Sequence, residues 1–388
     1  MGLKTVMTLD TRAHPHRIMS IAYAVVTLGL GVMVLAAPLP VLLDRFMPDD
    51  AFYYLQPARN FALTGFSSFD GIHFTNGYQP LWFLFNVPVF WLSPSGGEAP
   101  IRLLLVVQIM LSVAATILAV RSIARLSSIQ AASIACTIWI IILQRVMLNG
   151  LETALLMLLY VLLFNLYSHT FETPTLRLFL TLGIVAGLTF LARTDSVFLV
   201  VGLFAALAIR TLRRGAMSQA PADPRPVQGG GSRLLYLLLF AVPIGVLAGA
   251  YLLINLRMTG RLMPVSGAAK QIFSVPARQA AIQELGSPLK ATLRNFTWPL
   301  TTNYRFVLVG LLGPWALMFL PVWSVASTEK VLRMRQFWPF YLGATAAFLF
   351  YVLSFYGVFS RTPWYYGPHT FLACLSVSVL SQLIDDNL

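Results

Sequence analysis

Residues 18–43 read IMSIAYAVVTLGLGVMVLAAPLPVLL, a run of 26 residues that contains no charged side chain. A bilayer core needs roughly 20 consecutive apolar residues to be spanned by an α-helix. Within hydrocarbon only helices and closed barrels satisfy all their backbone polar groups, and this run is continuous rather than alternating. The stretch therefore predicts a transmembrane helix.

Similar apolar segments recur along the chain of 388 residues, of which 57% are hydrophobic and 11% are charged. Soluble domains carry about 25% charged residues. Composition and apolar runs together predict an all-α polytopic membrane protein. The further segments lie at 101–120, 127–147, 153–168, 177–192, 196–211, 234–255, 306–326, 337–357 and 368–384.

One more segment, residues 80–93, is short and contains Pro80, Asn86 and Pro88. If it does not cross, the basic clusters at the N-terminus, at Arg121 and Arg125, in 212–233 and near 330–335 all face the cytoplasm. If it crosses, every cluster except the N-terminal one lies outside. Since cytoplasmic loops collect Lys and Arg, we predict about ten spanning helices with both termini cytoplasmic. Residues 80–93 then form a helix at, or dipping into, the outer surface.

The Pro- and Gly-rich segment 212–233 predicts a flexible cytoplasmic linker. It divides an N-terminal membrane module, 1–211, from a C-terminal membrane module, 234–388. The first module carries an outer loop at 44–100, and the second carries one at 256–305. No internal repeat is visible, which weakens a comparison with transporters built from inverted repeats.

The remaining composition excludes several function classes. The formal net charge is +13, but basic cytoplasmic loops explain it, and the sequence has no P-loop, zinc-finger spacing or RNA-binding signature, so nucleic acid is not an expected partner. Cys136 and Cys374 lie inside apolar runs and are interpreted as packing residues. The five histidines show no metal-ligand spacing, so neither a metal nor another cofactor is predicted; a divalent cation is not indicated.

The first outer loop carries the richest motif. It begins Pro48-Asp49-Asp50-Ala51-Phe52-Tyr53-Tyr54 directly after the first predicted helix. One interpretation is structural, with Asp49 capping a short helix that starts at Asp50. The other is catalytic, because a carboxylate at a membrane boundary is partly desolvated and can serve as a general base. The same loop continues through Arg59 and Asn60 to Asn76-Gly77-Tyr78-Gln79-Pro80-Leu81-Trp82.

Four further elements fall on the same predicted face. Each also has a structural interpretation: Glu152 at a favourable helix start, Arg193 and Asp195 as a local ion pair, and the aromatic residues as an interfacial belt. The elements are Asn149-Gly150-Leu151-Glu152-Thr153-Ala154, Leu191-Ala192-Arg193-Thr194-Asp195, residues 255–270 with Arg257, Arg261 and Lys270, and Arg361-Thr362-Pro363-Trp364-Tyr365-Tyr366.

The order Asp-Asp after the first helix, Asn-Gly-Tyr-Gln-Pro-Leu-Trp, Gly-Leu-Glu-Thr-Ala and Ala-Arg-Thr-Asp resembles the GT-C superfamily of membrane glycosyltransferases. The resemblance covers roughly residues 18–270 and is nearest to bacterial arabinofuranosyl- and mannosyltransferases. Many of those enzymes have Arg-Pro-Asp where this chain has Arg193-Thr194-Asp195. The resemblance implies a polyprenyl-phosphate sugar donor, a site on the periplasmic side of a bacterial inner membrane, and a catalytic or anchoring acid after the first helix.

The expected reaction is an inverting transfer of a hexosyl or pentosyl group to a hydroxyl of a glycan, lipid or protein. Asp49 is preferred to Asp50 as the base, and the aromatic residues Tyr53, Tyr54, Tyr78 and Trp364 are expected to stack on sugar faces. Arg193 and Arg361 occupy short outer turns, which suggests that they hold the donor phosphate. The full set of predicted substrate-binding residues is Tyr53, Tyr54, Arg59, Asn76, Tyr78, Glu152, Arg193, Asp195, Arg257, Arg261, Lys270, Arg361, Trp364 and Tyr365.

Two alternatives remain at this point. A transporter or flippase of a lipid-linked sugar would need ionisable residues or broken helices near the middle of the membrane, and the predicted spans carry almost no charge. A non-catalytic membrane scaffold is the second alternative.

The topology makes a direct prediction. A cysteine placed at Gly96, between residues 80–93 and the next span, should react with an impermeant thiol reagent added to intact cells. Labelling that appears only after permeabilisation would mean that residues 80–93 cross the bilayer.

Overall fold

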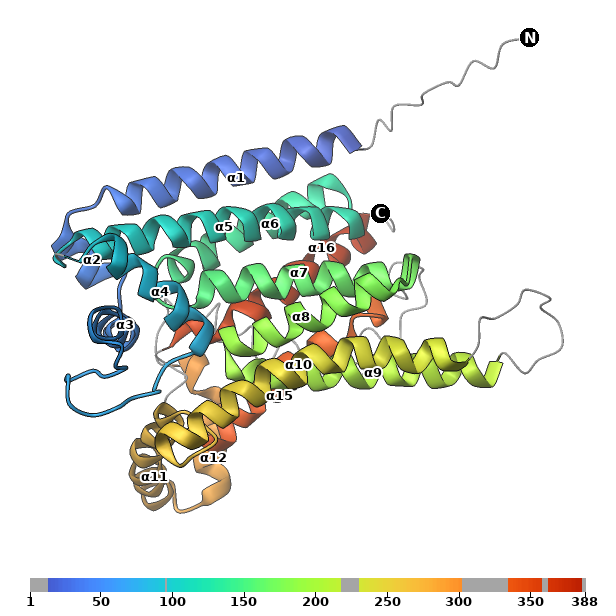
Figure 1. Cartoon of the computed structure of the whole chain (residues 1–388). Coiled ribbons are helices and arrows are strands. Elements are labelled where there is room, and N and C mark those ends of the chain that lie inside the picture. Colours follow the sequence, from blue (N-terminus) through green and yellow to red (C-terminus); the bar gives the residue numbers. More distant parts are fainter. Residues whose placement is uncertain (1–12, 95, 218–229, 302–333, 358–361, 386–388) are drawn as a thin grey trace, which may run out of the picture.

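The structure is a computed structural model of the chain (Figure 1), and it describes residues 13–94, 96–217, 230–301, 334–357 and 362–385. Within these residues all regular elements are helices, and the one β contact is an isolated bridge between Ser68 and Phe74. The prediction of an all-α chain is therefore confirmed for the described residues.

The helices follow the predicted apolar segments, and additional helices lie in both predicted outer loops. The α-helices are α1 (Ala13–Leu35), α2 (Leu39–Arg45), α3 (Phe52–Thr64), α4 (Pro80–Leu92), α5 (Ala99–Leu126), α6 (Ile129–Met147), α7 (Thr153–Glu172), α8 (Leu176–Ala192), α9 (Val197–Met217), α10 (Gly230–Thr259), α11 (Val265–Leu285), α12 (Pro288–Thr301), α15 (Trp338–Ser354) and α16 (Gly367–Asp385). The described residues also include the short 3₁₀ helices η1 (Asp49–Ala51), η2 (Thr194–Ser196) and η4 (Pro363–Tyr366).

Six of the described helices are long and apolar enough to span a membrane: α1, α5, α6, α7, α9 and α10. Three shorter apolar helices, α4, α8 and α15, have 13, 17 and 17 residues. These lengths are compatible with an integral membrane protein. The predicted span at 306–326 lies outside the described residues, so the count of ten spans stays a prediction.

The first predicted segment, 18–43, is two helices rather than one. α1 ends at Leu35, and α2 begins at Leu39 directly after Pro38. Proline lacks a backbone N–H and disfavours helical geometry in the residue before it. The break at Pro38 therefore separates the long helix from a short one that leads toward η1.

The connection between α1 and α5 leaves and returns at the same end of the bundle. The Arg102 guanidinium, in the first turn of α5, donates hydrogen bonds to the carbonyls of Leu35 and Ala37, the latter at 3.2 Å. α4 lies within this connection and has only 13 residues. This is the geometry that a non-crossing 80–93 requires, and α2, α3, α4, α11 and α12 gather at this end in Figure 1.

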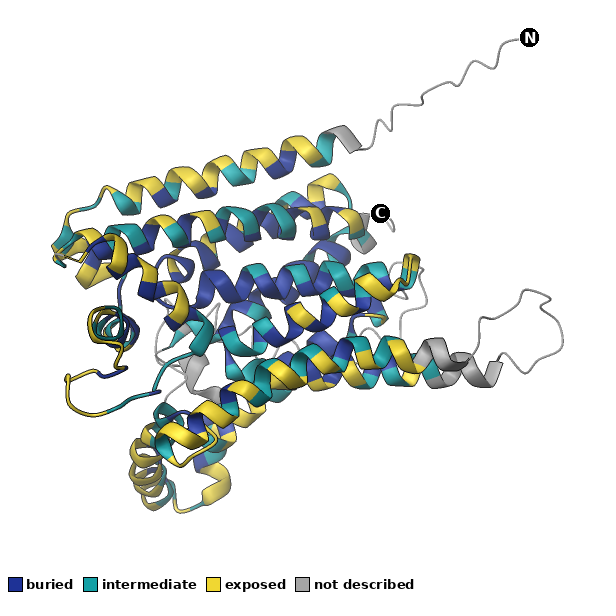
Figure 2. Ribbon diagram, viewed as in Figure 1, coloured by how far each residue is buried: buried dark blue, intermediate teal, exposed yellow. Residues whose placement is uncertain are grey.

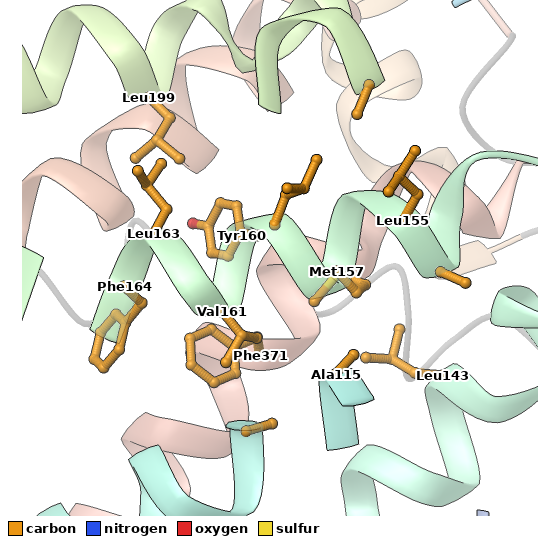
Figure 3. Close-up of a cluster of buried hydrophobic side chains, with 14 of the residues drawn as sticks. Ala115, Leu143, Leu155, Met157, Tyr160, Val161, Leu163, Phe164, Leu199 and Phe371 are labelled. Atoms are coloured by element: carbon orange, nitrogen blue, oxygen red, sulfur yellow. The ribbon is translucent and has the colours of Figure 1, made fainter. Parts of the chain in front are cut away.

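Apolar packing concentrates on α7, which lies in the interior of the bundle (Figure 2). Figure 3 shows Tyr160 and Phe164 of α7 facing Phe371 of α16. The Phe164 and Phe371 rings meet edge to face with centroids 5.2 Å apart, and Phe371 is fully buried. Such pairs add about 0.5–1.5 kcal/mol beyond area burial. α1, by contrast, is exposed along most of its length.

α8 and α10 approach closely through a glycine. A Cβ at Gly183 would lie 2.3 Å from the carbonyl oxygen of Phe240 and 2.9 Å from that of Leu239. Small residues at helix contacts allow such backbone approach in membrane proteins. Gly183 therefore fixes the distance between the two helices.

We predict that Gly183→Ala destabilises the protein by roughly 1–3 kcal/mol, because both clashing atoms belong to backbone and the helices must separate. The measurement is the midpoint of thermal unfolding in detergent. Gly249→Ala on α10 is the matched control, since a Cβ there meets nothing within 4 Å. Equal midpoints for the two variants would contradict close packing at Gly183.

Candidate active site

A cavity of about 500 Å³ opens at the end of the bundle where the two predicted outer segments meet. It lies between η1 and α3, the segment that leads into α4, the start of α7, the first turns of α11, and η4. Its walls are formed by Asp50, Tyr53, Tyr54, Pro57, Phe69, Thr75, Gly77, Tyr78, Gln79, Leu151, Glu152, Val265, Ser266, Ala269, Lys270, Phe273, Trp364 and Tyr365.

Eight of the predicted site residues line this cavity, although they come from four separate stretches of sequence. They are Asp50, Tyr53, Tyr54, Tyr78, Glu152, Lys270, Trp364 and Tyr365. The remaining predicted residues are elsewhere: Asp49, Arg59, Arg257 and Arg261 are exposed, Asn76, Arg193 and Asp195 lie outside its lining, and Arg361 lies outside the described residues.

Asp49 and Asp50 have different surroundings although they are adjacent. Asp49 is exposed, and its carboxylate accepts a hydrogen bond from the Asp50 backbone N–H at 3.0 Å. Asp50 is partly buried and faces the cavity. Burial raises the pKa of the Asp50 carboxyl, Lys270 and Arg193 lower it, and Asp49 raises it. The sequence analysis preferred Asp49 as the base, whereas the geometry favours Asp50.

Lys270 is the cation that faces Asp50 across the cavity. It lies on α11 and donates a hydrogen bond to the hydroxyl of Tyr365, and its Nζ is 5.1 Å from the centre of that ring. Burial alone would lower the pKa of Lys270, but Tyr365 and Asp50 outweigh this effect and the pKa is raised. The ammonium group thus remains charged beside the cavity.

Arg193 lies outside the cavity lining and is bound by protein groups. Its Nε donates to Asp195 Oδ2 at 3.0 Å, and one terminal nitrogen donates to the Trp364 carbonyl at 3.0 Å. The same nitrogen is 3.5 Å from Glu152 Oε1, and the guanidinium lies 3.8 Å from the centre of the Tyr365 ring. Only 3% of the Arg193 side chain is exposed. Arg193 therefore ties α7, α8 and η4 together rather than facing a ligand directly.

Each carboxylate beside Arg193 also accepts a hydrogen bond from a tyrosine, on the second oxygen of Glu152 and on the same oxygen, Oδ2, of Asp195. Tyr54 donates to Glu152 Oε2 at 2.9 Å, and Tyr351 of α15 donates to Asp195. Burial alone would lower the pKa of Arg193, but Asp195, Tyr351 and Glu152 outweigh it and raise the pKa. The ion pair expected between Arg193 and Asp195 is present, with Arg193 Nε 3.0 Å from Asp195 Oδ2. Glu152 occupies the N-cap position of α7, but its side chain makes no capping hydrogen bond.

The turn before Glu152 sets the position of η1. Gly150 has φ of +82°, and a Cβ there would lie 2.7 Å from Met47 Cε and 2.8 Å from Ala51 Cβ. Trp82 donates to the Gly150 carbonyl at 2.9 Å, and Gln108 accepts from the Gly150 N–H at 3.0 Å. A side chain at this position would displace the segment that carries Asp50.

Asn76 joins the two outer segments. Its Nδ2 donates to Asn255 Oδ1 at 3.0 Å, and its Oδ1 accepts from the Val265 N–H at 3.1 Å. These bonds hold the beginning of α11, and hence Lys270, against the first outer segment. Asn76 is a positioning residue in this arrangement.

Sequence reasoning missed the rest of the α11 surface. Ser266, Ala269, Lys270 and Phe273 line the cavity together, at the three- and four-residue spacing of one helix face. This spacing is visible in the sequence, but it indicates a shared face only once residues 265–285 are recognised as a helix. Among the described residues, no group of three or more His, Cys, Asp or Glu is placed to hold a metal ion.

Comparison of the chain with models of protein families, with curated proteins and with solved structures finds no match in any of the three. The functional interpretation therefore rests on the residues of the site.

We predict that Arg193→Met lowers the free energy of unfolding by roughly 3–5 kcal/mol, because it leaves Glu152 and Asp195 as buried carboxylates without their shared cation. Thermal or denaturant unfolding in detergent measures it. Arg257→Gln, at an exposed position in the last turn of α10, should change stability by no more than about 0.5 kcal/mol. Similar stability of the two variants would show that Arg193 does not hold the site together.

Proposed function

We propose that this chain is an inverting membrane glycosyltransferase that moves a sugar from a polyprenyl-phosphate donor to an acceptor hydroxyl. The observation that supports it most directly is the cavity lined by the partly buried carboxylate of Asp50 and the ammonium group of Lys270 among aromatic side chains. The proposal includes membership of the GT-C superfamily and a site on the periplasmic side of a bacterial inner membrane. The likeness in motif order supports that membership.

The two charged groups suit the two charge changes of this reaction. The acceptor oxygen attacks the anomeric carbon as the bond from that carbon to the phosphate oxygen breaks. The acceptor proton passes to Asp50, whose raised pKa makes it a better proton acceptor than an ordinary carboxylate. The phosphate leaves with an additional negative charge, which the Lys270 ammonium stabilises. A single displacement inverts the configuration at the anomeric carbon.

The aromatic walls suit a sugar. Tyr53 and Trp364 border the cavity from α3 and η4, and Tyr53 is 51% exposed. Tyr78 has one face stacked on Phe83 at 4.1 Å and donates to or accepts from Ser67 at 2.6 Å. The apolar faces of sugar rings pack on such surfaces.

The position of the cavity favours an enzyme over a transporter. Transporter sites lie near the middle of the membrane, between repeats and at broken helices. This cavity lies at one end of the bundle, beside the start of α7 and the end of α8. This position supports a site at which a lipid-linked sugar meets an acceptor at one face of the membrane.

The decisive test compares two amide variants in purified protein supplied with radiolabelled polyprenyl-phosphate sugars and candidate acceptors. We expect Asp50→Asn to reduce the transfer rate by about 10²–10⁴-fold with near-normal donor binding, because it removes the general base. Asp49→Asn is the matched control and should retain most of the activity. The reverse result would assign the base to Asp49, and two active variants would refute the mechanism.

The pH dependence gives a second readout of the same assignment. The rate should fall on the acid side as Asp50 becomes protonated, with a midpoint above the ordinary carboxyl pKa of 3.8. Because Lys270 lowers the pKa of Asp50, Lys270→Met should move this fall to higher pH and weaken donor binding. If the fall in rate at low pH does not move in Lys270→Met, that fall does not report the protonation of Asp50.

A further inference from the structure

A second hollow of about 180 Å³ lies between α1 and α5, away from the candidate active site. Its α1 side is formed by Ser20, Ile21, Ala24, Val25 and Leu28, and its α5 side by Val113, Ile117 and Arg121. Because the helices are antiparallel, Leu28 lies near Val113 and Ser20 lies near Arg121. We call this hollow the α1–α5 groove.

The groove begins where the tight packing of the two helices ends. Toward the outer-loop end, a Cβ on Gly31 would lie only 2.8 Å from Ile109 Cγ1. Between Leu28 and Ser20 of α1, the two helices are separated by the groove. Its α1 wall is well exposed, with Ile21 63% and Val25 62% accessible. In a bilayer this surface faces hydrocarbon, where an apolar chain fills the space that neither helix occupies.

A cation stands at the far end of the groove. Arg121 is exposed and makes no hydrogen bond or ion pair with the residues that the structure describes. It lies 22 positions after Ala99, about 33 Å along the helix axis at 1.5 Å per residue. That length is close to the ~30 Å hydrocarbon core, so Arg121 reaches the headgroup level of the opposite leaflet.

Two more arginines stand beside this mouth. Arg17 is exposed, lies one turn before Ile21 on α1, and like Arg121 has no polar partner within the described chain. Arg125 lies one turn after Arg121 and donates to Asn165 Oδ1 at 3.4 Å. The mouth therefore combines an apolar groove with cations that lack a nearby carboxylate among the described residues.

We propose that the α1–α5 groove binds an anionic phospholipid of the leaflet at which α1 begins. One acyl chain lies between Ala24 and Ile117, and the headgroup phosphate binds Arg121 and Arg17. The phosphate supplies the negative charge that these arginines lack, and the chain completes the packing of the peripheral helix α1. By the charge distribution of the loops this is the cytoplasmic leaflet. The site is separate from the proposed catalytic cavity and does not depend on its function.

Native mass spectrometry in nonionic detergent can test this with dioleoyl-phosphatidylglycerol and dioleoyl-phosphatidylcholine as probes. The first phosphatidylglycerol molecule should bind at least about fivefold more tightly than phosphatidylcholine, since each basic residue near a membrane surface contributes a preference of about that size. Arg121→Gln should reduce this preference, and Arg121→Gln combined with Arg17→Gln should abolish it. Arg177→Gln is the matched control, because Arg177 is exposed at the start of α8, away from the groove, and it should preserve the preference.

Groove-filling variants separate a lipid site from a merely interfacial arginine. Ala24→Phe, and independently Ile117→Phe, should reduce binding of the first molecule of either lipid about fivefold or more while Arg121 is retained. Thermal unfolding identifies whichever variant remains folded. A preference that is unchanged in Arg121→Gln or persists in the double variant, or normal lipid binding in a folded groove-filling variant, would overturn the proposal.

Discussion

The candidate site depends on the burial of one guanidinium group between carboxylates. Arg193 contacts Asp195 at 3.0 Å and Glu152 at 3.5 Å, and it also donates to the Trp364 carbonyl. A buried charge is costly unless its partners and hydrogen bonds are complete. Each of these contacts comes from a different part of the chain, so the network forms only when α7, α8 and η4 are in place. The site and the packing of the bundle end are thus one structure.

Because of this constraint, the cations at the cavity end of the bundle have different roles. Arg193 is occupied by protein groups, and Arg257 and Arg261 are exposed outside the cavity lining. Lys270 instead points its ammonium group toward the cavity and is held there by Tyr365, which itself lies against Arg193. Arg193 therefore influences the proposed phosphate site through Tyr365, as a positioning residue, rather than by contact with a donor.

Much of this arrangement was predictable from the sequence, and the limits have physical causes. Continuous apolar runs located the helices, because hydrocarbon permits little else at that length. The sequence also identified aromatic and acidic residues of the first outer loop as site candidates, and several of them line the cavity. The choice between Asp49 and Asp50 was not predictable, since successive side chains in a 3₁₀ helix point about 120° apart. A one-residue change of register there exchanges the exposed carboxylate for the buried one.

The same reasoning explains why a cation count did not identify the proposed phosphate-binding residue. Arg193 and Lys270 both lie in predicted outer segments, and of the carboxylates that meet Arg193 only the neighbouring Asp195 could be expected from the sequence. The long-range contacts were not predictable: Glu152 lies 3.5 Å from Arg193, whereas Asn76 fixes the start of the helix that carries Lys270. A guanidinium has the planar, multiple donors needed to bridge several acceptors, and an ammonium is a compact point charge. Arg193 therefore bridges several protein acceptors, while Lys270 remains beside the cavity.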